Sequence, residues 1–131
     1  MPDITIEIRR TVAPQEENRI MEAVHSALRE AFKVPEWDRI VRLVVHEPRR
    51  FQVSPRLANP ELFTLVTIDA FQGRSIEAKR ALYAAIVRNL NALGIPANHV
   101  LVQVREAPRE NWGVAGGKAA SDIDLGFSVN V

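Results

Sequence analysis

The sequence predicts an α+β fold of two layers, in which tandem βαβ repeats form a four-stranded sheet with two helices on one face. Three observations predict it: an alternating apolar start, two segments with helical periodicity, and the same proline punctuation in both halves. At 131 residues, 47% of them hydrophobic, the chain suffices for one core and is too short for two ordinary domains. We expect a single domain over residues 1–131, with repeats at about 1–58 and 59–131.

The first repeat begins with the segment ITIEI, where apolar and polar residues alternate and predict a strand at about residues 3–9. Pro14 suits the first position of a helix, and apolar residues then recur at helical spacing as far as Phe32. A Val-Pro pair ends this helix, because the residue before a proline is pushed out of helical geometry. The apolar segment 40–46 predicts the second strand.

The second repeat follows the same plan, with a strand at 62–71, a helix at 75–93 and a strand at 99–106. Gly94 is a candidate C-cap for the helix. An Ile-Pro pair after this helix repeats the Val-Pro pair after the first, so we interpret the two halves as an internal duplication. The glycine-rich segment 110–122 predicts a hairpin.

One face of the predicted sheet lacks a covering layer. Both helices are expected on the same face, since each belongs to a right-handed crossover, and the strands carry apolar residues on both faces. The bare face is therefore expected to be buried by self-association in a closed cyclic oligomer.

Composition excludes several classes of function. The net charge is +1 and the arginines are scattered, which argues against nucleic acid as a partner. There is no cysteine, hence no disulfide or thiolate chemistry, and the three histidines show no metal-ligand spacing. No segment approaches the run of about 18 apolar residues that a membrane span needs, and the start lacks a signal-peptide pattern, so a cytoplasmic protein is expected.

Pro2 would carry a free secondary amine if the initiator methionine were removed. An apolar surrounding disfavours the charged form of such an amine and makes it a base, whereas a neighbouring carboxylate holds the proton and makes it a general acid. Taken alone, a proline after the initiator is common and indicates no function.

Five further residues are candidates for chemistry or binding. Arg74, at a strand-to-helix junction, is either a clamp for a carboxylate or a solvated loop residue. Arg42 lies in an apolar strand and needs a partner or a site. Trp112 is a pocket wall or an interface aromatic, while His25 and Asp38 are most simply structural residues of a helix and a turn.

Together these residues resemble the tautomerase superfamily over essentially the whole chain. The segments GRSIEAK and NWGVAGGKAAS are similar to 4-oxalocrotonate tautomerase, and the first repeat supplies Pro2 and a VRxxxxE pattern. The resemblance implies the tautomerase (MIF-like) fold, a homotrimer with one site per chain, no cofactor and a small anionic carboxylate substrate. It implies that Pro2 is the catalytic base, that Arg74 and Arg42 bind or polarise the substrate, and that Trp112 walls the pocket.

Among fused members, the segments AVHSALREAFKVPEWDR and GIPANHVLVQV resemble malonate semialdehyde decarboxylase. That resemblance implies that Asp38 is a catalytic aspartate and that Arg74 is one of two arginines, while His25, at the edge of the apolar face of the first helix, stays a candidate binding residue. The chain departs from the decarboxylase pattern at Gln72, where a second arginine is expected, although Arg39 or Arg42 could compensate.

Three interpretations stay open at this point. With Pro2 as neutral base the protein is a tautomerase of a 2-oxo or enol acid. With Pro2 held protonated by Asp38 it is a decarboxylase or hydratase of a 3-oxo or unsaturated acid. If Met1 is retained, the proline nitrogen is an amide and the trimer is a non-catalytic binding module.

Overall fold

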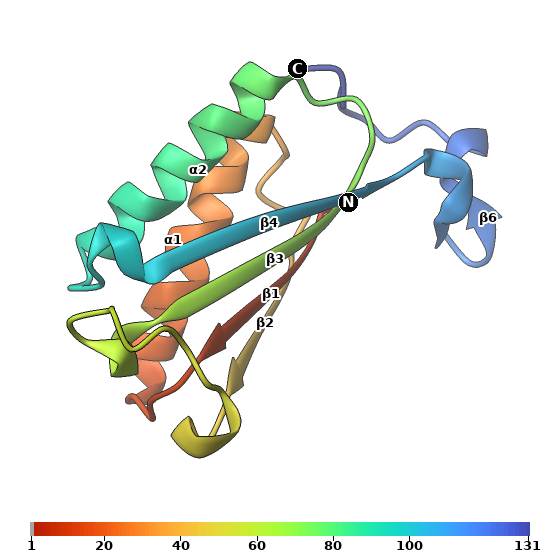
Figure 1. The fold of residues 1–131 in the computed structure, drawn as a ribbon. Helices are drawn as coiled ribbons and strands as arrows, with labels where there is room; N and C mark the ends of the chain where they lie inside the picture. The colour runs from red at the N-terminus through yellow and green to blue at the C-terminus, as the bar shows by residue number, and fades with distance from the viewer. Residues whose placement is uncertain (1) are drawn as a thin grey trace.

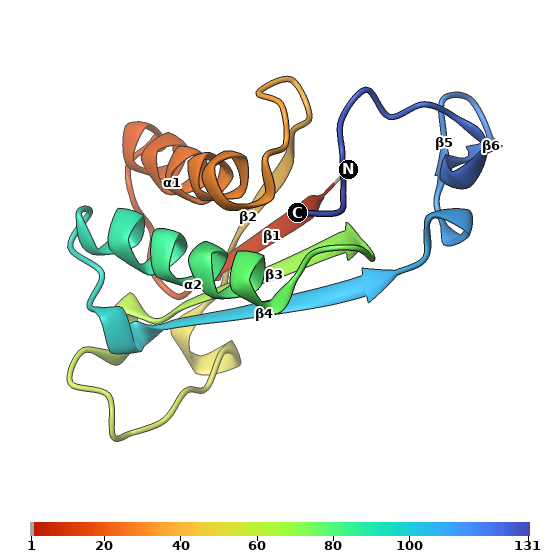
Figure 2. The same cartoon turned by 90° about the horizontal axis from the view of Figure 1, so that it is seen from above.

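The computed structural model describes residues 2–131 and confirms the predicted two-layer α+β fold (Figure 1). The main sheet has the order β2-β1-β3-β4. Its strands are β1 (Asp3–Ile8), β2 (Ile40–Val45), β3 (Thr64–Phe71) and β4 (Val100–Ala107). Both long helices, α1 (Pro14–Phe32) and α2 (Ile76–Asn91), cover the same face of this sheet (Figure 2). Short 3-10 turns lie at Pro48–Arg50, Pro60–Leu62, Ala97–His99, Arg109–Asn111 and Ala120–Asp122.

The two βαβ units meet at the centre of the sheet. β1 runs parallel to β2, β3 runs parallel to β4, and the central pair of β1 with β3 is antiparallel. Asp3 is therefore level with Ile40 at the start of β2, and with Asp69 near the end of β3. This register brings the start of the chain, the α1–β2 loop and the β3–α2 loop to the same end of the strands. We call this end of the sheet the site edge.

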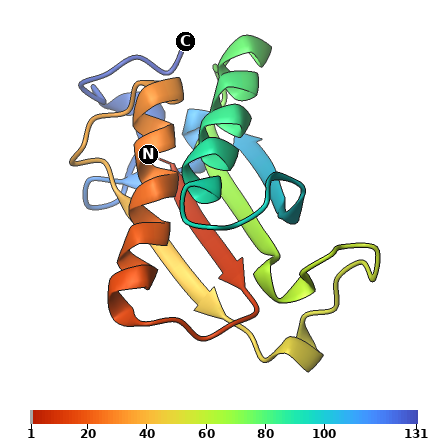
Figure 3. The same ribbon diagram turned by 90° about the vertical axis from the view of Figure 1, so that its left-hand side faces the viewer.

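The hydrophobic core lies between the sheet and the two helices. Alternate residues of β1, namely Ile4, Ile6 and Ile8, are fully buried against the helices, as the alternation in the sequence predicts. Each such side chain contributes roughly 1.5–3 kcal/mol when it leaves water. The helices lie side by side above the strands (Figure 3), and Asn89 of α2 donates to the Ala23 carbonyl of α1 at 3.0 Å.

The helix ends follow local rules closely. Pro14 is the first residue of α1, and Lys33 ends that helix in a left-handed conformation with a φ of 58°. Ser75 caps α2 by accepting a hydrogen bond from the Ala78 amide at 3.1 Å. α2 ends at Asn91, and Gly94, with a φ of 93°, lies in the turn that follows.

The face of the sheet away from the helices, here the outer face, is mixed in character. Asp3 pairs with Arg42 and Asp69 pairs with Arg105, at 2.9 and 2.8 Å. Large apolar side chains are also exposed on this face, namely Ile40 and Val44 of β2 and Leu101 of β4. The outer face is thus more polar than the apolar strand sequences predict, because its charged residues neutralise one another across neighbouring strands.

The predicted hairpin is present as β5 (Gly113–Val114) and β6 (Lys118–Ala119). The chain then returns to the site edge as a segment at 123–131, which we call the C-terminal strap (Figure 2). Its last residue, Val131, accepts a hydrogen bond from the Ser75 amide at 2.8 Å. No helix within residues 2–131 combines the length and apolar character needed to cross a membrane.

Candidate active site

Arg74 stands out at the site edge because it is a charged residue that is almost completely buried. Its side chain is only 6% exposed, and its guanidinium carbon lies 4.9 Å from the centre of the Phe32 ring. Nη1 donates to the Phe71 carbonyl oxygen at 3.2 Å. Nε and Nη2 are buried and have no hydrogen-bond partner among residues 2–131. Because buried N–H groups are almost always paired, these donors indicate a binding position for an anion.

The local sequence explains how Arg74 comes to be buried. β3 ends at Phe71, and Gly73 turns the chain with a φ of 133°, a conformation that side chains other than glycine rarely adopt. Ser75 then caps α2, so Arg74 sits between the strand end and the helix start. The positive end of the helix dipole adds to the charge of the guanidinium there.

The charges of two carboxylates affect the pKa of Arg74. Burial lowers the pKa of the Arg74 guanidinium below its ordinary value, and the charges of Glu106 and Asp38 oppose that shift. Glu106 is engaged by Lys79 at 2.6 Å. Asp38 is only 5% exposed and belongs to the α1–β2 loop. The site edge thus holds a buried cation within the field of a buried carboxylate.

Pro2 is buried and directly precedes β1. Asp3, the next residue, faces the outer side and pairs with Arg42, while Ile4 faces the helices. Continuing this alternation places Pro2 on the helix side of the sheet, at the same edge as Asp38 and Arg74. The processing of Met1 concerns a residue outside those that the structure describes.

His25 supports the α1–β2 loop. It is 1% exposed on α1, and its Nε2 donates to the Asp38 carbonyl oxygen at 3.2 Å. The Asp38 amide in turn donates to the Pro35 carbonyl at 3.1 Å. His25 therefore holds the backbone of Asp38 in place, and we assign it a positioning contact.

The structure places three candidates away from this cluster. Arg42 points to the outer face, where it bonds Asp3 and Thr5. Arg39 pairs with Glu22 of α1 on the surface at 2.9 Å. Gln72 is exposed, and its backbone amide donates to the Ala107 carbonyl oxygen at 3.1 Å.

Trp112 reaches the site edge through Phe71. The two rings meet edge to face, with centroids 5.1 Å apart and an interplanar angle of 80°. Phe71 is fully buried, and its carbonyl is the group that accepts from Arg74. Trp112 therefore packs against the residue that ends β3, directly before the loop that carries Arg74.

A cavity of about 310 Å³ opens beside Asp38 and Phe71. Its walls are otherwise mainly apolar and come from Trp37, Val114, Leu125 and Phe127. The sequence interpretation missed these residues, because the strap that carries Leu125 and Phe127 is far from the site edge along the chain. The one available signal was the VPEW segment, where Trp37 directly precedes Asp38.

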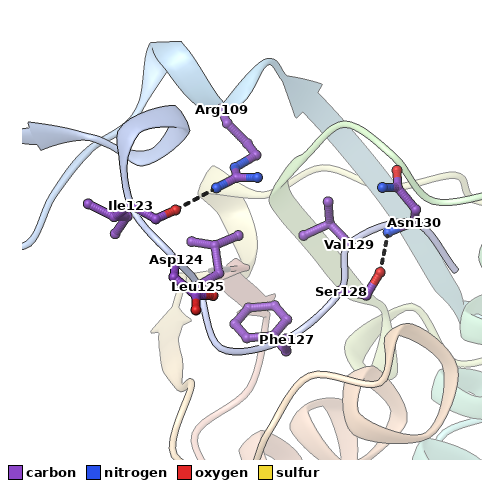
Figure 4. Close-up of a pocket in the computed structure, with 8 residues that line it drawn as sticks. All are labelled: Arg109, Ile123, Asp124, Leu125, Phe127, Ser128, Val129 and Asn130. Carbon is purple, nitrogen blue, oxygen red and sulfur yellow. Dashed lines mark hydrogen bonds between the residues drawn. The ribbon is translucent and has the colours of Figure 1, made fainter.

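Arg109 holds the base of the strap in position. Its Nη2 donates to the carbonyl oxygens of Ala120 and Ile123 at 2.8 and 2.9 Å. Figure 4 shows the hydrogen bond from Arg109 to Ile123. Leu125 and Phe127 lie on the same segment and line a second hollow of about 200 Å³. This role of Arg109 was also absent from the sequence interpretation.

Comparison with known proteins decides the family. The family model described as "Tautomerase enzyme" matches residues 38–115, which is more than half of the chain. The chain belongs to this tautomerase family of enzymes. It is 44% identical over 46 residues to 2-hydroxymuconate tautomerase from Comamonas testosteroni, a match that covers 34% of this chain and 73% of that protein. It is 40% identical over 53 residues to a probable tautomerase from Ralstonia nicotianae, covering 40% of this chain and 76% of the relative.

Solved structures of other tautomerase-superfamily members share the fold. Malonate semialdehyde decarboxylase inhibited by 3-bromopropiolate superposes with a TM-score of 0.80 at 23% identity, covering 94% of this chain and 98% of that one. A native fused 4-OT superposes with a TM-score of 0.82 at 20% identity, covering 95% and 99% of the two chains. The predicted family and fold are therefore confirmed.

Proposed function

We propose that the protein is a cofactor-independent tautomerase in which the Pro2 amine moves a proton between carbon and oxygen of a small 2-oxo or enol carboxylic acid. Arg74 carries this proposal, because it is a buried arginine with two N–H groups that no residue from 2 to 131 accepts. A carboxylate would fit such donors through two charge-assisted hydrogen bonds. The family supports the reaction type, since its relatives include a 2-hydroxymuconate tautomerase.

The chemistry follows from the positions at the site edge. A neutral Pro2 amine removes a proton from the carbon next to the carbonyl, and the electron pair moves onto the carbonyl oxygen as an enolate. The positive charge of Arg74 stabilises the developing negative charge, and return of the proton to oxygen completes the change. The amine has to be unblocked, so the proposal requires loss of Met1.

A decarboxylase or hydratase is the second candidate, and Asp38 is the observation that favours it. Asp38 is buried at the site edge, and its charge acts on Arg74. A carboxylate beside the amine would hold Pro2 protonated, and an ammonium can polarise a 3-oxo carbonyl or protonate a carbanion. Gln72 supplies no second cation, because the sequence has glutamine there and the residue is exposed.

The deciding experiment combines intact mass with an activity panel. Intact mass of the purified protein should show loss of one methionine. A panel of 2-oxo, 3-oxo and enol acids is then assayed with the wild type and with Pro2→Ala. We expect turnover of 2-oxo or enol acids that falls roughly a hundredfold or more in the variant. Retained Met1, or equal rates for both proteins, would reject the catalytic amine and leave a binding module as the alternative.

A further inference from the structure

The apolar cavity borders the proposed site, with which it shares Asp38. Asp38 forms part of its wall, and so does the side chain of Phe71, whose carbonyl oxygen accepts from Arg74. A carboxylate held by Arg74 would therefore stand close to the cavity. The other residues that line the cavity are mainly apolar, so an apolar group of the substrate could fill it.

The far wall of the cavity is built by aromatic and branched residues from two distant segments. Trp37, from the α1–β2 loop, meets Phe127 of the C-terminal strap edge to face, with ring centroids 6.2 Å apart. The rest of the apolar lining consists of Val114, Ala115, Ile123 and Leu125, and Asp124 is a second acidic residue in the wall. Trp37 is nevertheless 71% exposed, which is unusual for so large an apolar side chain.

The strap is held firmly enough to act as a wall. Arg109 binds the carbonyl of Ile123 at the start of the strap, and the Ser75 amide binds Val131 at its end. Gly73 packs against the strap so closely that an added Cβ would lie 3.0 Å from the Val129 carbonyl oxygen. The cavity thus has a defined shape between two anchored ends.

We propose that the substrate of this enzyme carries an apolar group, of the size of a six-membered ring or a branched alkyl chain, that fills the cavity between Trp37, Leu125 and Phe127. The inference rests on the proposed function, because it places the reacting acid at Arg74. The size agrees with the space available, since an apolar cavity of about 150 Å³ is enough to hold benzene and this one measures about 310 Å³.

The test uses exchange of the C3 protons of 2-oxo acids for deuterium in D₂O, followed by proton NMR. The three probes are 2-oxobutanoate, 4-methyl-2-oxopentanoate and 3-phenylpyruvate, and each enzymatic rate is divided by the rate without enzyme. We expect the two acids with larger apolar groups to exceed 2-oxobutanoate in normalised kcat/KM at least tenfold, which is the discrimination that an apolar pocket commonly achieves.

Two variants then test whether the preference for larger apolar groups arises in this cavity. Leu125→Trp fills the cavity and Trp37→Ala removes an exposed wall, so each should reduce the preference for 3-phenylpyruvate over 2-oxobutanoate at least fivefold. Leu93→Trp is the matched control, because Leu93 lines a hollow between α1 and the end of α2 that shares no lining residue with the cavity beside Asp38. The control should leave the preference unchanged.

The outcomes separate this inference from the proposed function. Exchange that depends on Pro2 but shows no preference for larger groups, or a preference that both cavity variants retain, overturns the inference alone. A change in sedimentation of Leu125→Trp also overturns it, because the cavity would then be covered by a second copy of the chain. Absence of Pro2-dependent exchange with all three acids overturns the proposed function and the inference together.

Discussion

The guanidinium of Arg74 stacks on Phe32, with 4.9 Å between its carbon and the ring centroid. This contact joins the last residue of α1 to the loop that precedes α2. A cation over an aromatic face at this distance is stabilised by roughly 1 kcal/mol. Nε and Nη2 of the same guanidinium are buried and have no hydrogen-bond partner among residues 2–131.

Replacing Arg74 should therefore damage catalysis more than stability. Arg74→Ala is expected to lower kcat/KM for a 2-oxo acid roughly a hundredfold or more, because the charge that stabilises the enolate is lost. Arg74→Lys should restore only part of this, since a lysine lacks the planar fork that matches a carboxylate. Arg88→Ala is the matched control, because Arg88 pairs with Glu30 on the surface. Steady-state kinetics with full activity in Arg74→Ala would contradict the assigned site.

Asp38 should set the charge of the proposed catalytic amine. A neighbouring carboxylate stabilises the ammonium form, which raises the pKa of the Pro2 amine. Asp38→Asn removes that effect, so the amine loses its proton at lower pH and the acidic limb of the kcat/KM profile for tautomerisation should move to lower pH. Any activity that needs the protonated amine, such as decarboxylation, should fall at neutral pH.

The control for Asp38 is Glu36→Gln. Glu36 belongs to the same loop, and its side chain is 74% exposed. The pH profile of kcat/KM for Glu36→Gln should superpose on that of the wild type. An acidic limb that stays in place in Asp38→Asn would argue that this residue serves only to shape the loop.

Gly73→Ala should destabilise the fold and loosen the strap. The added Cβ would lie 2.8 Å from Asn130 Oδ1 and 3.0 Å from the Val129 carbonyl, in a conformation with a φ of 133°. We expect the free energy of unfolding to fall by roughly 1–3 kcal/mol. Gly94→Ala isolates the backbone strain, because Gly94 also has a positive φ but no atom within 4 Å of its Cβ. Chemical denaturation that gives equal losses for both variants would show that the strap contact contributes nothing.

The outer face should be buried in a homotrimer. Leu101 stands 54% exposed on the outer face of this chain, together with the exposed Ile40 and Val44, and burial of such apolar surface favours self-association. Sedimentation should give three times the 14.7 kDa mass of one chain. Leu101→Glu should shift the protein toward monomer, because it places a charge in the apolar part of the interface.

Ile76→Glu provides the comparison for that experiment. Ile76 is a similarly exposed apolar residue, at 51%, but it lies at the start of α2. The trimer should survive this change. A wild-type protein that sediments as a single chain would remove the reason for expecting a buried outer face.

Local patterns in the sequence determined the elements and the family. The alternation of ITIEI, the placement of Pro14 and the two Xaa-Pro helix ends each reflect a rule that acts over a few residues, so the strands and helices were predicted within about three residues at each end. The GRSIEAK segment likewise predicted a strand-to-helix junction with Arg74 at it, and the structure adds that Ser75 caps the helix.

Only the tertiary structure decided which side of the sheet each residue faces and what the strap covers. Arg42 pairs with Thr5, the polar member of the β1 alternation, and the register therefore puts its side chain on the outer face, away from Arg74. Leu125 and Phe127 reach the site edge through hydrogen bonds made by Arg109 and Ser75, and such long-range contacts have no local signature. The direction of a side chain along a strand depends on the pairing register between distant segments. This register is what places Pro2, Asp38 and Arg74 at the site edge.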